Sequence, residues 1–199
     1  MSIESYLNHL KEKTKEYNVK LILKNQKYFL DEGVPIGGYF LEEPLELAVA
    51  INKPKKIWIP YLIHEDSHLD QWIDQYTNTQ VKGCASELMH SWIAGNNYPT
   101  EIIHKAIESL REMELDCERR ALKKIKQFDL PIDQLYYIKS AAINIHQYNY
   151  ALFRRKYLRK GKTLPYENKQ LISEMPITLR GNFRRLTKKQ LKAFDNFTI

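Results

Sequence analysis

The stretch Ile63-His64-Glu65-Asp66-Ser67-His68-Leu69 contains the pattern H-E-x-x-H, and the interpretation of the whole chain starts from it. In a helix, two histidines four positions apart lie one above the other on one face, so both imidazoles can bind one Zn²⁺. Glu65 follows the first histidine and would stand beside the metal, where it can take a proton from a water that attacks a carbonyl. The pattern therefore predicts His64 and His68 as metal ligands and Glu65 as a catalytic general base.

Apolar residues flank this motif on both sides. Residues 57–63 form the run IWIPYLI, and Leu69, Trp72 and Ile73 continue an apolar stripe beyond His68. This predicts that the motif lies on a buried helix. A structural alternative is an amphipathic helix with two hydrogen-bonded histidines and a solvated glutamate.

A third metal ligand is expected from a long helix over residues 100–128, whose apolar residues keep helical spacing. Glu114 falls within its apolar stripe, and a buried carboxylate requires a metal or another cation. Glu118 lies one turn further on, where it could accept a hydrogen bond from a metal-bound imidazole. The other interpretation of Glu114 is a boundary residue that pairs with Arg111 or Arg119.

Two other residues compete with Glu114. Asp74 stands six residues after the second histidine, where H-E-x-x-H-x-x-G-x-x-(H/D) proteins carry their third ligand, but Gln71 replaces the glycine that breaks the helix there. We therefore expect the helix to continue and Asp74 to point away. Cys117 shares the face of Glu114 but is more often a small buried apolar residue. Three further histidines belong to no motif and are expected to be structural: His90, His104 and His146.

The segment before the motif predicts a helix followed by a small sheet. We expect a helix at residues 3–17 and strands at 19–23, 28–30, 38–41 and 47–51, with a polar turn at 24–27 joining the first two strands. Strands followed by a metal-binding helix indicate an α+β fold. The sheet could offer an edge strand to an extended peptide beside the metal.

Positive charge is concentrated in the last quarter of the chain. Residues 150–199 hold 13 Lys/Arg and 3 Asp/Glu, whereas residues 1–149 hold 18 and 21. A basic tail favours an acidic partner such as nucleic acid, although a solvated basic extension is equally common. We expect helix within residues 131–160, rich in tyrosine, and loosely structured chain after about residue 163.

Composition limits the class of protein. The 199 residues suit one domain with an appendage, and 43% hydrophobic residues can supply a core. The two cysteines, Cys84 and Cys117, are too few for a disulfide framework, and no apolar run reaches the roughly 20 residues that a membrane span needs. With its polar start, the chain is expected to be soluble and cytoplasmic.

The order Gly38-Tyr39-Phe40, the motif, and then Glu114-Leu115-Asp116-Cys117-Glu118-Arg119-Arg120-Ala121 resembles the gluzincin-type zincin metallopeptidases. It is most similar to the ImmA/IrrE-like group, and short, basic, tyrosine-rich proteins of this kind also occur in phages. The resemblance implies His64, His68 and Glu114 as zinc ligands, Glu65 as general base, and peptide-bond hydrolysis of a protein substrate, in some members a repressor. Cys117 and Arg120 depart from that group's usual alanine and phenylalanine.

Together these features predict an α+β chain. A small, mainly helical zincin-like domain with a short N-terminal sheet would cover residues 1–130, and a basic helical extension would cover residues 131–199. The expected function is that of a zinc-dependent metalloendopeptidase, with Glu118 supporting the site and weak nucleic-acid contact through the tail. The alternatives are a degenerate zincin without turnover and a non-catalytic helical protein whose basic tail holds nucleic acid or a protein partner.

Overall fold

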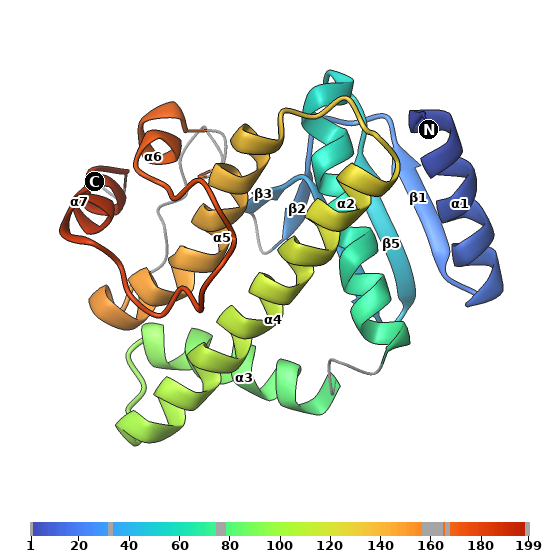
Figure 1. The fold of residues 1–199 in the computed structure, drawn as a ribbon. Helices are drawn as coiled ribbons and strands as arrows, with labels where there is room; N and C mark the ends of the chain where they lie inside the picture. The colour runs from blue at the N-terminus through green and yellow to red at the C-terminus, as the bar shows by residue number, and fades with distance from the viewer. Residues whose placement is uncertain (1, 32–33, 75–78, 157–164, 166–167, 198–199) are drawn as a thin grey trace. The chain divides into compact units, whose positions relative to one another are not determined.

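A computed structural model describes residues 2–31, 34–74, 79–156, 165 and 168–197. The chain is mainly helical with a small sheet, as the α+β prediction requires. The elements are α1 (Ile3–Glu16), β1 (Lys20–Lys24), β2 (Phe29–Asp31), β3 (Val34–Ile36), β4 (Gly38–Glu42), β5 (Leu45–Ala50), α2 (Lys55–Ile73), α3 (Thr79–Ile93), α4 (Thr100–Gln127), α5 (Gln134–Arg154), α6 (Lys169–Ser173) and α7 (Lys188–Phe197) (Figure 1).

The chain forms two compact units. The first unit comprises residues 1–76 and 117–134, and the second comprises residues 77–116 and 135–199. The boundary between them divides α4, whose last eleven residues belong to the first unit. The expected division into residues 1–130 and 131–199 stays a prediction.

The first unit is built on a sheet with the strand order β1-β5-β4. β5 is central, parallel to β1 and antiparallel to β4, and its residues Leu47–Ala50 are fully buried. Helix α2 packs on β4 and β5, with Leu62, Ile63 and Leu69 in the core. The apolar run before the histidines therefore holds the motif helix against the sheet.

Two strand predictions needed correction. The residues of β1 and β2 were expected to be joined as neighbours by a polar turn, but β1 pairs with β5 and β2 pairs with β3. No strand was predicted at residues 34–36, where the structure has β3. A three-residue strand such as β3 is too short to show alternation in sequence.

Among the described residues of the second unit, apolar side chains gather in two clusters. The first joins α3, the start of α4 and α5 through residues that include Met89, Ile107 and Leu110. The second joins α5, α6 and α7 through residues that include Tyr150, Leu171 and Phe194.

The expectation of loosely structured chain after residue 163 was wrong for α6 and α7, whereas residues 174–187 between them form neither helix nor strand. Asn168 caps α6 by accepting a hydrogen bond from the Leu171 backbone N–H. Thr187 and Gln190 form reciprocal hydrogen bonds at the start of α7, as in a capping box. Both short helices are stabilised by burial of their apolar sides. Among the described residues, no helix has the length and apolar character to cross a membrane.

Candidate metal centre

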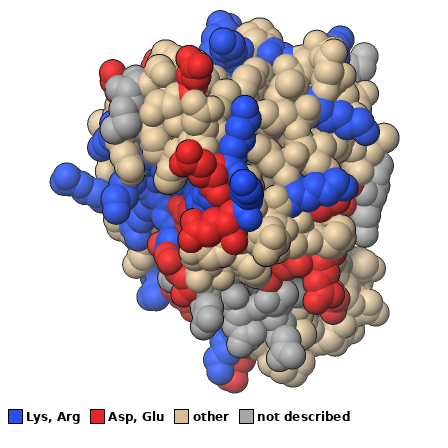
Figure 2. Space-filling view, turned by 90° about the vertical axis from the view of Figure 1, so that its right-hand side faces the viewer, with Lys and Arg blue, Asp and Glu red and all other residues tan. Residues whose placement is uncertain are grey.

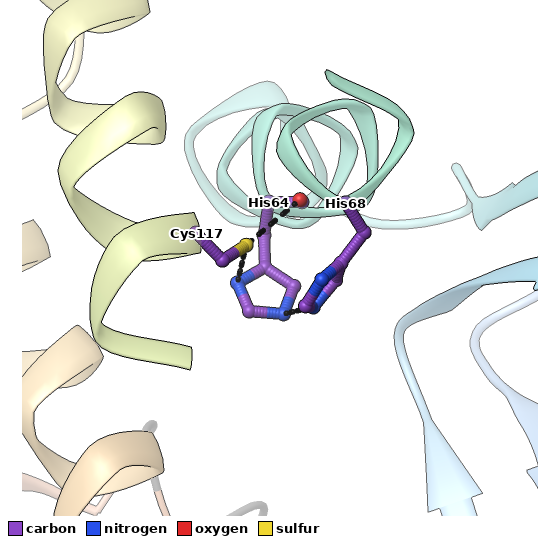
Figure 3. Close-up of side chains that lie close together, drawn as sticks. All are labelled: His64, His68 and Cys117. Carbon is purple, nitrogen blue, oxygen red and sulfur yellow. Dashed lines mark hydrogen bonds between the residues drawn. The ribbon is translucent and has the colours of Figure 1, made fainter. Parts of the chain in front are cut away.

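Helix α2 brings the two motif histidines together. The imidazole rings of His64 and His68 meet edge to face, with centroids 4.7 Å apart, and their Nε2 atoms lie 3.2 Å from each other (Figure 3). His68 is buried, and the side chain of His64 is 18% exposed. The four-residue spacing therefore yields the juxtaposition expected on one helical face.

The opposite nitrogen of each ring contacts a side-chain oxygen. Nδ1 of His64 lies 3.1 Å from Oε1 of Glu118, and Nδ1 of His68 lies 2.9 Å from Oε1 of Gln71. An ionised carboxylate and an amide oxygen only accept hydrogen bonds, so these contacts place a proton on each Nδ1. In the neutral rings, both Nε2 lone pairs then face one another.

This arrangement fits a tetrahedral metal ion. With Zn–N bonds of about 2.0–2.1 Å, two ligand nitrogens of one tetrahedral zinc lie roughly 3.3–3.4 Å apart, close to the observed separation of 3.2 Å. Ligand histidines usually donate their other N–H to a carboxylate or carbonyl-type oxygen, which fixes the tautomer. The donor set therefore satisfies both requirements of a histidine metal site.

Cys117 of α4 completes a group of potential ligands. His64, His68 and Cys117 each offer an atom within 4.8 Å of the others, so the group could hold a metal ion. The sulfur, however, lies 3.7 Å from Nδ1 of His64 and 3.4 Å from the His64 carbonyl oxygen. Figure 3 shows it on the Nδ1 side of the ring, whereas His68 meets Nε2. A metal held by the two Nε2 atoms therefore lies away from the sulfur contact.

The surroundings of His64 favour a positive charge. Burial lowers the pKa of this imidazole, but the charges of Cys117 and Glu118 raise it, and the net pKa is well above its ordinary value. The side chain of Glu118 is only 2% exposed, and a positive charge on or beside the imidazole ring would compensate the burial of its carboxylate. Its contact with His64 is the one that the sequence suggested, while its role toward a metal stays a prediction.

Glu65 lies next to the start of β4. A Cβ atom added to Gly38 would come within 3.2 Å of Cγ of Glu65 and within 2.7 Å of the Ala48 carbonyl oxygen. Tyr61, one turn earlier on α2, lies so close to Gly37 that a Cβ atom added there would clash with the Tyr61 ring. The two glycines therefore allow close contact between α2 and the beginning of the edge strand, with the Glu65 side chain half-buried there.

Glu114 lies on α4, in the second unit. It is buried, with 9% of its surface exposed, and the hydroxyl of Tyr148 donates a hydrogen bond of 3.3 Å to its Oε1. The alternative partner Arg111 instead contacts Glu108 and Asn149. Burial of this carboxylate agrees with the apolar stripe, and its role as third ligand stays a prediction.

The competing ligand Asp74 has a different environment. Helix α2 continues past Gln71 without a break, as expected, and ends at Ile73, one residue before Asp74. Asp74 is the C-cap, and its carboxylate lies 2.5 Å from the Arg120 guanidinium. Its side chain is 57% exposed. Of the histidines outside the motif, His90 and His104 are exposed and His146 is buried.

No family model, curated protein or solved structure matches this chain. The resemblance to zincins therefore stays a prediction.

Sequence reasoning missed Gln71 as a partner of the site. It was considered only as the residue that replaces a glycine, but it is fully buried and contacts His68. Its position three residues after His68, on the same helical face, was the available signal.

A buried ionic cluster behind the histidines was also missed. Asp66 is fully buried on the opposite side of α2, where it pairs with Lys13 of α1 and Lys124 of α4 and accepts a hydrogen bond from Tyr6. Both lysines also contact Asp70, each at 2.6 Å. The cluster links the three helices α1, α2 and α4.

Proposed function

We propose that this chain is a zinc-dependent metalloendopeptidase. The observation that supports this most directly is the 3.2 Å separation of two histidine Nε2 atoms whose Nδ1 atoms both contact acceptors. Two imidazoles oriented in this way repel each other at Nε2 unless a proton or a metal ion lies between them. His64 and His68 would hold the zinc, with Glu114 as the proposed third ligand.

The chain's own residues have distinct roles in this proposal. When bound, zinc would lower the pKa of a water molecule and polarise the scissile carbonyl. Glu65, next to the first ligand, would accept the water proton on its carboxylate and pass it to the leaving amine. Glu118 and Gln71 would hold the two imidazoles in the tautomer that leaves Nε2 available.

The sheet provides a place for an extended substrate. β4 is an edge strand of its sheet among the described residues, and its first residue, Gly38, lies against Glu65. A peptide pairing with a sheet edge is bound mainly through backbone hydrogen bonds. This mode would bring a scissile bond near Glu65 and favours endopeptidase action on unfolded or extended segments.

The proposal is tested by proteolysis with the zinc-reconstituted chain. The substrates are an unfolded protein and a mixture of quenched fluorescent peptides, cleaved by the wild-type chain, by Glu65→Gln and by Glu12→Gln. Glu12 is an exposed glutamate of α1 and serves as a matched control. Loss of a general base is expected to lower kcat/KM by roughly 10²–10⁴-fold, while the control variant retains wild-type activity.

Metal content distinguishes the possible outcomes. Glu65→Gln should retain zinc, because its side chain is not a proposed ligand. A zinc-loaded wild-type chain that cleaves none of the substrates would favour a degenerate zincin. Unchanged cleavage by Glu65→Gln would contradict the proposed mechanism.

A further inference from the structure

We propose that the polar side of α7 is a binding surface for the phosphate backbone of nucleic acid. Lys188, Lys189 and Lys192 lie within about 100° of one another around this helix, and all three are exposed. We call these three lysines the basic face. This surface is independent of the proposed zinc chemistry.

The basic face is held in a fixed orientation by its own unit. The opposite side of α7 buries Ala193 and Phe194 against α5 and α6. The preceding segment is fixed as well, because the Phe183 carbonyl accepts a 2.6 Å hydrogen bond from Asn149 of α5. The three lysines therefore stand on an ordered helix, in the part of the chain coloured red in Figure 1.

In the segment before α7, Arg184 pairs with Glu108 and Glu112 of α4, whereas the lysines of α7 form no ion pair with a described residue. Residues 175–194 contain no aspartate or glutamate. The next acidic residue, Asp195, contacts Arg154 through both carboxylate oxygens and accepts a hydrogen bond from Tyr150. In the described part of the chain, the three lysines have no acidic partner, and exposed Arg180 and Arg185 add further positive charge.

The position of the lysines favours an anionic ligand. Lys188 and Lys189 occupy the first turn of α7, whereas the helix dipole favours anions at that end. A phosphate group there would interact with both the lysine charges and the helix N-terminus. By contrast, the face that carries α1 shows acidic and basic side chains interspersed (Figure 2).

The same geometry argues against a membrane surface as the partner. A helix that lies in a lipid interface must insert its apolar side among the lipids. The apolar side of α7 is already buried within its own unit. Only the polar side is available, which suits a partner recognised by charge alone.

The test compares two triple variants of the full chain. One is Lys188→Gln/Lys189→Gln/Lys192→Gln. The control is Lys11→Gln/Lys55→Gln/Lys56→Gln, which removes the same charge from exposed lysines of α1 and α2. Circular dichroism checks that both remain folded. Binding to labelled duplex DNA, to duplex RNA and to vesicles containing anionic lipid is measured over a range of salt concentrations.

For non-specific binding, the wild-type chain should bind a duplex with Kd of about 10⁻⁴–10⁻⁶ M at physiological salt. Loss of the three lysines should weaken binding roughly tenfold or more and reduce the slope of log K against log salt by about 2–3, while the control changes little. Binding of DNA, RNA or both supports the proposal and identifies the polymer. Absence of duplex binding, equal losses in both variants, or binding to vesicles alone would overturn it.

Discussion

Nε2 of His64 lies 3.2 Å from Nε2 of His68, while Nδ1 of each ring contacts a side-chain oxygen. Two acceptor nitrogens facing each other at this distance repel unless a proton or a metal ion lies between them. Burial lowers the pKa of His64, but Cys117 and Glu118 favour a positive charge on its ring and outweigh the effect of burial, so the pKa is raised. A protonated His64 would donate its Nε2–H to His68, and a bound metal ion would take the place of that proton.

The contact of Gln71 with His68 should increase the affinity of this site for zinc. Gln71→Ala removes the acceptor that orients His68, and loss of such a partner typically weakens metal binding about 10–100-fold. Gln71→Glu retains an acceptor oxygen and should restore most of the affinity. Competition with a chromophoric chelator measures both constants. Equal zinc affinity in Gln71→Ala and the wild-type chain would show that the contact has no role in metal binding.

The third ligand can be identified by comparing Glu114→Ala with Cys117→Ala. We expect zinc affinity to fall strongly in the first variant and little in the second, because the Cys117 sulfur lies on the Nδ1 side of His64. Cobalt substitution gives an independent measure, since thiolate ligands produce an intense charge-transfer absorption. Such a band in the wild-type chain, lost in Cys117→Ala, would assign the cysteine as the ligand instead.

The motif helix could be predicted from the H-E-x-x-H spacing and its apolar flanks, and the long helix α4 from the helical spacing of its apolar residues. The apolar stripe of α4 indicated that Glu114 would be buried, as it is. The pairing of β1 with β5 could not be predicted, since the two strands are parallel and separated by three other strands. The helices α6 and α7 were missed because their stability comes from packing against α5, which local sequence does not reveal.

Substitution of Asp66 should lower the free energy of unfolding more than substitution of an exposed aspartate. Asp66→Asn leaves Lys13 and Lys124 partly uncompensated in a buried cluster, and breaking such a pair typically costs about 3–5 kcal/mol. Asp74→Asn is the control, because its pair with Arg120 is largely exposed and should contribute at most about 1 kcal/mol. Urea unfolding of both variants measures the difference. Equal losses would show that the buried cluster does not anchor α2.

His146 should make the second unit less stable in acid. Burial and the nearby Arg111 charge lower its pKa to about 4, below its ordinary value of 6.5. Between these values the unfolded chain binds a proton that the folded chain does not, so stability falls as pH decreases from 6.5 to 4. The contribution lost is about 3 kcal/mol.

The matched variants for this prediction are His146→Gln and His104→Gln, the second at an exposed position. Urea unfolding at several pH values between 7 and 4 should show a weaker pH dependence in His146→Gln and an unchanged one in His104→Gln. Identical pH dependence in all three chains would contradict the assignment to His146.

Some of the site could be derived from residue spacing and some could not. His64, His68 and Glu65 follow from one five-residue pattern, because a helix fixes their relative positions. The contact between Gly38 and Glu65 depends on how α2 packs on the sheet, which spacing along the chain does not reveal. The cluster around Asp66 likewise requires α1 and α4 to be placed beside α2.

The most direct test of the central claim is the zinc content of the purified chain, measured by elemental analysis after reconstitution and removal of free metal. We expect about one zinc per chain in the wild type and a strong loss in both His64→Ala and His68→Ala, with His104→Ala unchanged. Circular dichroism confirms that each variant is folded. A folded wild-type chain without stoichiometric zinc, or equal zinc in all four proteins, would contradict the metal centre and the peptidase function built on it.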